Sequence, residues 1–157
     1  MILVVSFQSC SDKNDKLYHT LEKNFSDSIK LLKAEEFEYK YDGLTPQTSY
    51  FVDSKIKFLT LKHSGELTDI EEKVIFDADS IGVIYVRKEY YADSNGEYRD
   101  WNKHKDTIYI YDYKKRNISI YQNSNLIKNK VITKSSKQQQ KFIYKVKNET
   151  ETEYNRR

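Results

Sequence analysis

Paired carboxylates are the first residues of this 157-residue chain whose spacing could support chemistry. Asp77 and Asp79 are two positions apart, so on a strand both would point to one face and could hold a substrate or a cation between them. General acid-base hydrolysis needs such a pair in a cleft, with the two pKa values pushed apart. The sequence Asp-Ala-Asp-Ser before Ile81 and Gly82 is, however, typical of a plain turn. We therefore assign no catalytic residue, and a hydrolase that uses Asp77 and Asp79 is the least favoured of three functional hypotheses.

Aromatic side chains are the second candidates, since the chain has 14 tyrosines, 7 phenylalanines and 1 tryptophan. Several flank Asn95-Gly96, a strong signal for a tight hairpin turn, or lie on the segment that follows. Tyrosine and tryptophan next to lysine and arginine can form a stacking surface for sugars. The predicted ligand-binding residues are Tyr91, Tyr98, Trp101, Tyr109 and Tyr111. The alternative is that these side chains only cover a half-exposed face of a sheet.

Metal and nucleotide sites are not indicated by the sequence. The three histidines, His19, His63 and His104, have no spacing typical of metal ligands. The four glycines are too scattered to form a phosphate-binding loop. We therefore predict no metal and no cofactor.

Charge is divided unevenly along the chain. Residues 1–100 carry 13 Lys and Arg against 19 Asp and Glu, whereas residues 101–157 carry 14 against 5. A basic carboxy-terminal third could contact anionic surfaces, or its lysines could only keep strand edges from pairing. Lysines outnumber arginines 22 to 5, and arginine is the residue that makes two-pronged contacts to phosphates and bases. Nucleic acid is therefore disfavoured as a partner.

The amino terminus carries a further signal. Residues 1–10 read Met-Ile-Leu-Val-Val-Ser-Phe-Gln-Ser-Cys, an uncharged apolar run that ends at the only cysteine, and the polar Ser11 to Lys16 follows. This segment resembles the lipobox of bacterial lipoproteins, in the relaxed form known from Bacteroidetes. The resemblance implies a cleaved signal peptide over 1–9, acylation of Cys10, and a lipidated tether over 10–16 at the outer membrane or cell surface. The alternative is that Ile2 to Phe7 forms the first strand of a cytosolic domain.

Periodicity predicts a helix followed by strands. Apolar residues recur every three or four positions from Asp15 to about Lys33, which is the pattern of an amphipathic helix. Beyond it, alternating or short apolar runs bounded by turn residues predict strands. An acidic turn or loop is expected at Glu66 to Glu72, and a disordered polar tail at 148–157. The predicted strands are Phe37–Tyr41, Tyr50–Lys62, Lys73–Phe76, Ile81–Tyr91, Ile108–Tyr113, Ile118–Tyr121, Leu126–Thr133 and Lys141–Val146.

These elements predict an α+β, mainly β fold. We expect one domain over 17–147, in which the amino-terminal helix packs on an antiparallel, curved meander sheet or partial barrel. The first functional hypothesis is a lipid-anchored envelope protein that works as a non-enzymatic binding or accessory module for a small apolar ligand, a saccharide or a protein. The second is a cytosolic interaction protein, for example a partner that neutralises a toxin, whose divided charge steers association.

Overall fold

A computed structural model describes residues 13–43, 45, 47–65, 68–90, 104–123, 125–138 and 140–157. Cys10 and the rest of the predicted signal and tether up to residue 12 lie outside these ranges, as does the Asn95-Gly96 turn. The predicted ligand residues Tyr91, Tyr98 and Trp101 also lie outside them.

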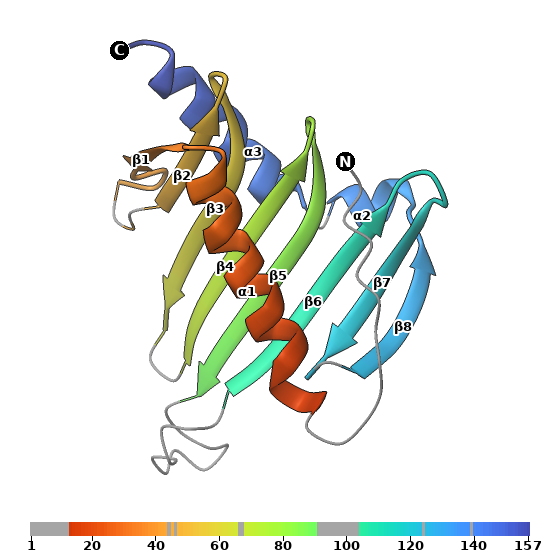
Figure 1. Cartoon of the computed structure of the whole chain (residues 1–157). Helices are drawn as coiled ribbons and strands as arrows, with labels where there is room; N and C mark the ends of the chain where they lie inside the picture. The colour runs from red at the N-terminus through yellow and green to blue at the C-terminus, as the bar shows by residue number, and fades with distance from the viewer. Residues whose placement is uncertain are drawn as a thin grey trace.

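Eight strands form one antiparallel sheet, in which each strand pairs with its neighbour in the sequence (Figure 1). The sheet is open, because β1 and β8 stand at opposite ends of the strand order. The predicted α+β, mainly β meander is therefore confirmed. The strands are β1 (Glu35–Tyr39), β2 (Gln47–Val52), β3 (Lys55–Ser64), β4 (Thr68–Asp77), β5 (Ser80–Tyr90), β6 (His104–Asp112), β7 (Asn117–Gln122) and β8 (Asn125–Val131).

The predicted amino-terminal helix is confirmed as α1 (Lys13–Leu31), which crosses one face of the sheet diagonally (Figure 1). Its apolar stripe buries Tyr18 and Phe25 against Phe58, Tyr85 and Ile108 of the sheet. Phe25 and Phe58 meet edge to face, with ring centroids 5.4 Å apart. This packing ties the helix to strands β3, β5 and β6.

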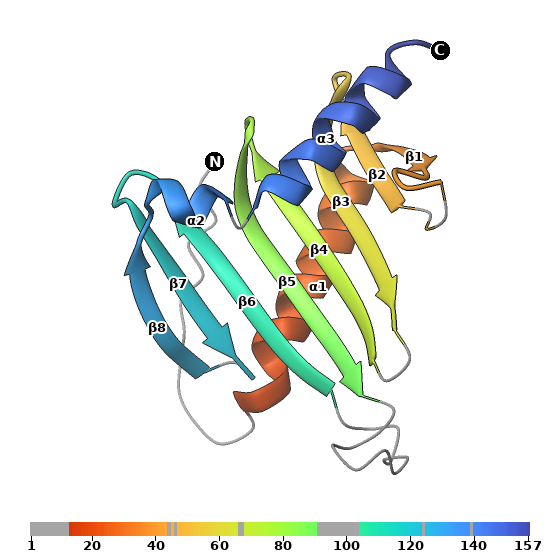
Figure 2. The ribbon, with the colours of Figure 1, turned by 180° about the vertical axis from the view of Figure 1, so that it is seen from behind.

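The other face carries two carboxy-terminal helices, α2 (Lys134–Gln138) and α3 (Lys141–Tyr154) (Figure 2). The predictions of a strand at Lys141–Val146 and of a disordered tail at 148–157 are both wrong. Ile143, Val146, Lys147 and Thr150 are buried at helical spacing, so this segment stabilises itself by packing one side against the sheet. At the end of the helix, the Tyr154 ring stacks on Phe51 at 3.9 Å.

Two local predictions also need correction. The strand expected over Tyr50–Lys62 is divided by a tight turn at Asp53 and Ser54. Their φ angles of 51° and 61° are typical of the two-residue turn that connects the strands of a β-hairpin. Of the acidic turn or loop expected at Glu66–Glu72, residues 68–72 instead begin β4, where they pair with β3 and β5. This second correction decides where Glu72 lies.

Candidate ligand-binding groove

Strand register places a row of side chains across the face that carries α3. Glu72 on β4 lies opposite Val86 on β5, Val86 opposite Thr107 on β6, and Thr107 opposite Gln122 on β7. The next row on this face runs from Val74 through Ile84 and Tyr109 to Ile120. Alternation along each strand puts both rows on the same side, since they are two residues apart. The sheet therefore presents a polar row beside an apolar row.

These rows form the floor of a groove of about 720 Å³. Helices α2 and α3 cross only one end of this face, and α3 lies toward β2 and β3 (Figure 2). Gln140, Phe142 and Ile143, at the start of α3, line one side of the groove, and Ile127 and Lys130 on β8 line the other. The volume is within the range of about 300–1,000 Å³ that is usual for sites that bind small molecules.

Glu72 is the acidic residue of the groove, and its carboxylate makes no hydrogen bond or ion pair with another described residue. Burial raises the pKa of this carboxyl, while the charge of His63 acts in the opposite direction. Burial also raises the pKa of the neighbouring Tyr109, and the negative charge of Glu72 adds to the effect. Glu72 therefore brings a charge into the groove that the described part of the chain does not neutralise.

Gln140 provides a second unpaired acceptor. Its side chain is 3% exposed, and its Oε1 atom has no hydrogen-bond partner among the described residues. Although Gln140 stands at the N-cap of α3, its side chain does not cap the helix. Burial raises the pKa of Tyr111 to about 12, against a smaller opposing effect of its hydrogen bond with Gln140. The side-chain amide of Gln140 is therefore hydrogen-bonded to Tyr111, while its carbonyl oxygen accepts no hydrogen bond from a described residue.

Comparison with known proteins adds no identification: no protein-family model, curated protein or solved structure matches this chain. Within the described ranges, none of the helices is long and apolar enough to cross a membrane. Nor do the described residues bring three or more His, Cys, Asp or Glu side chains together as a group that could hold a metal ion.

Of the five predicted ligand-binding residues, the structure brings Tyr109 and Tyr111 together in the groove. Sequence reasoning missed Glu72 and Gln140, because Glu72 fell in an expected turn or loop and Gln140 in the polar segment between two predicted strands. For Glu72 a sequence signal was present. Ile70, Glu72 and Val74 occupy every second position, so they share the face of β4 that carries the buried Val74.

The predicted turn at Asp77 and Asp79 is present. Ala78 between them has a φ of 53°, and Asp79 lies in the turn with its side chain 80% exposed. Its nearest cation is Lys147 on α3, 3.5 Å away. Neither carboxylate lines the groove, so the strand geometry that a hydrolytic pair would need is absent at these two residues.

The face under α1 has a smaller pocket, of about 300 Å³, lined mainly by charged residues. Several of the charges in and beside this pocket are paired within the chain. Lys73 bonds Glu22 at 2.6 Å and Glu71 at 3.0 Å, and Arg87 bonds both carboxylate oxygens of Asp106 at 2.9 and 3.0 Å. We therefore interpret this pocket as the end of a structural ion-pair network.

Proposed function

We propose that this protein is a non-enzymatic binding module that holds a small amphipathic ligand in the groove formed by β4–β8 and the start of α3. The observation that carries the proposal is the composition of the groove. Its floor places Ile84, Tyr109 and Ile120 in one row beside the polar Thr107 and Gln122 in the next. Sites for small ligands are mostly apolar, with a few convergent polar groups that fix orientation, and this groove has that character.

The envelope location is part of the same proposal. The lipobox-like sequence that ends at Cys10 supports acylation there, and acyl chains contribute about 0.8 kcal/mol per buried methylene, so that two or more give stable anchoring. The test compares the full chain with a Cys10→Ala variant in a bacterial host, by mass and by detergent-phase partitioning. Acylated chains that begin at Cys10 support the location. An unmodified, soluble wild-type chain that retains Met1 contradicts it and favours the cytosolic alternative.

Binding in the groove is tested by methyl NMR on the full chain with labelled isoleucines. We expect 1-octanol or octyl glucoside to shift the methyl resonances of Ile84, Ile120 and Ile143. A Thr107→Trp variant, which fills the floor, should abolish these shifts, whereas Asn129→Trp on exposed β8 should not. If no amphipathic probe shifts these methyls in the wild type, the proposed function is wrong.

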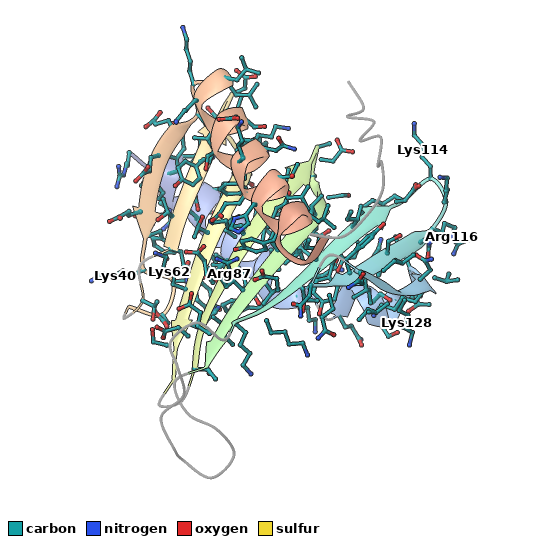
Figure 3. The ribbon with its side chains drawn as sticks, turned by 60° about the horizontal axis from the view of Figure 1, so that its bottom comes forward. Lys40, Lys62, Arg87, Lys114, Arg116 and Lys128 are labelled. Carbon is teal, nitrogen blue, oxygen red and sulfur yellow. The ribbon has the colours of Figure 1, made fainter. Side chains whose placement is uncertain are left out.

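A second candidate function, binding of a protein partner, is favoured by β8, which is an edge strand of the sheet among the described residues. Strand β8 exposes Leu126, Ile127 and Val131 by 51%, 56% and 63%. Lys114, Arg116 and Lys128 lie together on this side of the molecule, far from Lys40 and Lys62 (Figure 3). An edge strand can accept an extended segment, and the nearby Lys114, Arg116 and Lys128 favour an acidic one. Pull-down of an acidic partner by the wild type, lost in a Leu126→Lys, Val131→Lys variant, would support this function.

A further inference from the structure

Two acceptors in the groove, the Glu72 carboxylate and Gln140 Oε1, have no hydrogen-bond partner among the described residues. An ionised carboxylate has only acceptor sites, and the carbonyl oxygen of an amide also accepts. The Glu72 carboxylate is partly exposed and makes no hydrogen bond or ion pair with another described residue, whereas Gln140 Oε1 is buried without a partner. Buried acceptors in native structures are nearly always satisfied, by the protein, by water or by a ligand. The ligand that suits this groove is therefore one that donates hydrogen bonds.

The negative charge of Glu72 restricts the charge that a ligand can bring into the groove. A ligand carboxylate or phosphate beside it would bring two negative charges together, which is unfavourable at short range. The lysines of the groove do not supply the missing cation: Lys130 lies on β8, four strands away, and Lys105 lies one row beyond Thr107 on β6. His63 acts on Glu72 from β3, on the same face of the sheet, and its exposed ring packs against Phe142. Lys88 lies one row from Glu72 on β5, but among the described residues neither Lys88 nor His63 forms an ion pair with Glu72, so a ligand ammonium could pair with this carboxylate directly.

The surroundings of Glu72 suit an ammonium group attached to an apolar body. Tyr109 is close enough for the charge of Glu72 to affect its pKa, and the ring face of tyrosine attracts cations. Beyond Tyr109, the apolar side chains of Ile84, Ile120 and Ile143 line the groove. These groups can cover a hydrocarbon or aromatic portion of the ligand.

We propose that the groove binds an amphipathic amine whose ammonium group pairs with the Glu72 carboxylate. A further N–H or O–H donor of the ligand bonds Gln140 Oε1, and the apolar portion packs against Ile84, Ile120 and Ile143. This inference rests on the proposed function, because it assigns a ligand class to the same groove.

The experiment compares three probes with the same chain length: octylamine, 1-octanol and octanoate. Each is titrated at pH 7 into the full chain with labelled isoleucine methyls. Because a hydrogen bond to a charged group contributes about 1.5–3 kcal/mol, octylamine should bind about tenfold more tightly than 1-octanol, and octanoate most weakly. In Glu72→Gln this preference for the amine should fall to about twofold or less, whereas the exposed carboxylate variant Glu36→Gln should retain it.

A second measurement follows the carboxyl of Glu72 directly, by its carbon resonance during pH titration of the wild type. Saturation with octylamine should lower the pKa of Glu72, and saturation with 1-octanol should not. Equal binding of octanol and octylamine, or a preference that survives in Glu72→Gln, would overturn the ligand class while leaving a binding groove. Failure of all three probes to shift the isoleucine methyls would overturn the groove as a binding site, and the proposed function with it.

Discussion

The two faces of the sheet differ in how completely their buried polar side chains are paired. Under α1, Lys73 and Arg87 are paired with carboxylates of the chain. On the α3 side, Gln47 Oε1, Ser49 Oγ, Gln140 Oε1 and Thr150 Oγ1 are buried without hydrogen-bond partners among the described residues. An unpaired buried polar group costs about 1–3 kcal/mol, so the α3 side retains a cost that the α1 side avoids. The unpaired buried groups thus lie on the α3 side, and one of them, Gln140 Oε1, lines the proposed binding groove.

The largest expected change in stability comes from disrupting the packing of α3 against the sheet. Val146 on α3 is fully buried in the cluster that contains Phe51 and Leu59. A Val146→Asp substitution places an unpaired charge there, and we expect it to lower the free energy of unfolding by about 4 kcal/mol. Chemical denaturation measures the change. The control is Asn148→Asp, at an exposed position two residues further along the same helix. It should change the free energy of unfolding by less than about 0.5 kcal/mol.

The next effect concerns the paired charges under α1. In Asp106→Asn, the Arg87 guanidinium keeps its place 4.0 Å over the Tyr18 ring but loses its carboxylate. Because one partner of a largely buried pair is removed, we expect a loss of about 2–3 kcal/mol. Asp112→Asn, which removes an exposed pair with Lys115, should cost less than about 0.5 kcal/mol. Equal effects of the two variants in thermal denaturation would show that the Arg87 pair does not stabilise this face.

Glu22 should give a smaller effect with a defined pH dependence. Burial would raise the pKa of Glu22, but the hydrogen bond and charge of Lys73 outweigh it, so the pKa falls below the ordinary value of 4.5. The folded state thus binds fewer protons, and this pair stabilises the protein above pH 4.5 and is lost as the pH falls. Glu22→Gln should therefore cost about 0.5–1 kcal/mol at pH 7 and almost nothing at pH 3.

Glu72 should show the smallest change in stability, with the opposite sign. Burial raises its pKa above 4.5, so the folded state binds more protons and Glu72 destabilises the protein increasingly as the pH rises through that range. Glu72→Gln should leave stability unchanged at pH 3 and raise it by about 0.5 kcal/mol or less at pH 7. Denaturation curves at the two pH values measure both effects. If Glu22→Gln and Glu72→Gln change stability in the same direction at pH 7, the contrast between the faces is wrong.

The sequence predicted the fold where one pattern dominated a segment. The stripe through Tyr18 and Phe25 has only a helical interpretation, and alternation over Ile108 to Tyr113 has only a strand interpretation. In residues 141–146 the two patterns overlap, because Phe142, Tyr144 and Val146 alternate as on a strand, while Ile143 and Val146 are spaced as on a helix. Thr150 and Tyr154 decide in favour of the helix, but they lie among charged residues, and their burial depends on contact with β1–β3.

The candidate site was predictable only in part, for a physical reason. Tyr109 and Tyr111 were found because aromatic residues on a strand stand out in any sequence. Glu72 and Gln140 are polar residues in polar surroundings, and what distinguishes them is the absence of a partner after folding. That property depends on the whole arrangement of sheet and helix, so local sequence patterns do not reveal it.

The placement of α3 also sets an order of events during synthesis. Strands β1–β8 can each pair with the strand before them as they emerge, because every connection is local. The apolar side chains of β1–β4, including Phe37, Phe51 and Leu61, nevertheless remain uncovered until residues 141–154 have left the ribosome. The first half of the sheet must therefore wait for the last segment of the chain, and during that delay its open apolar face is the surface most prone to aggregation or to capture by chaperones.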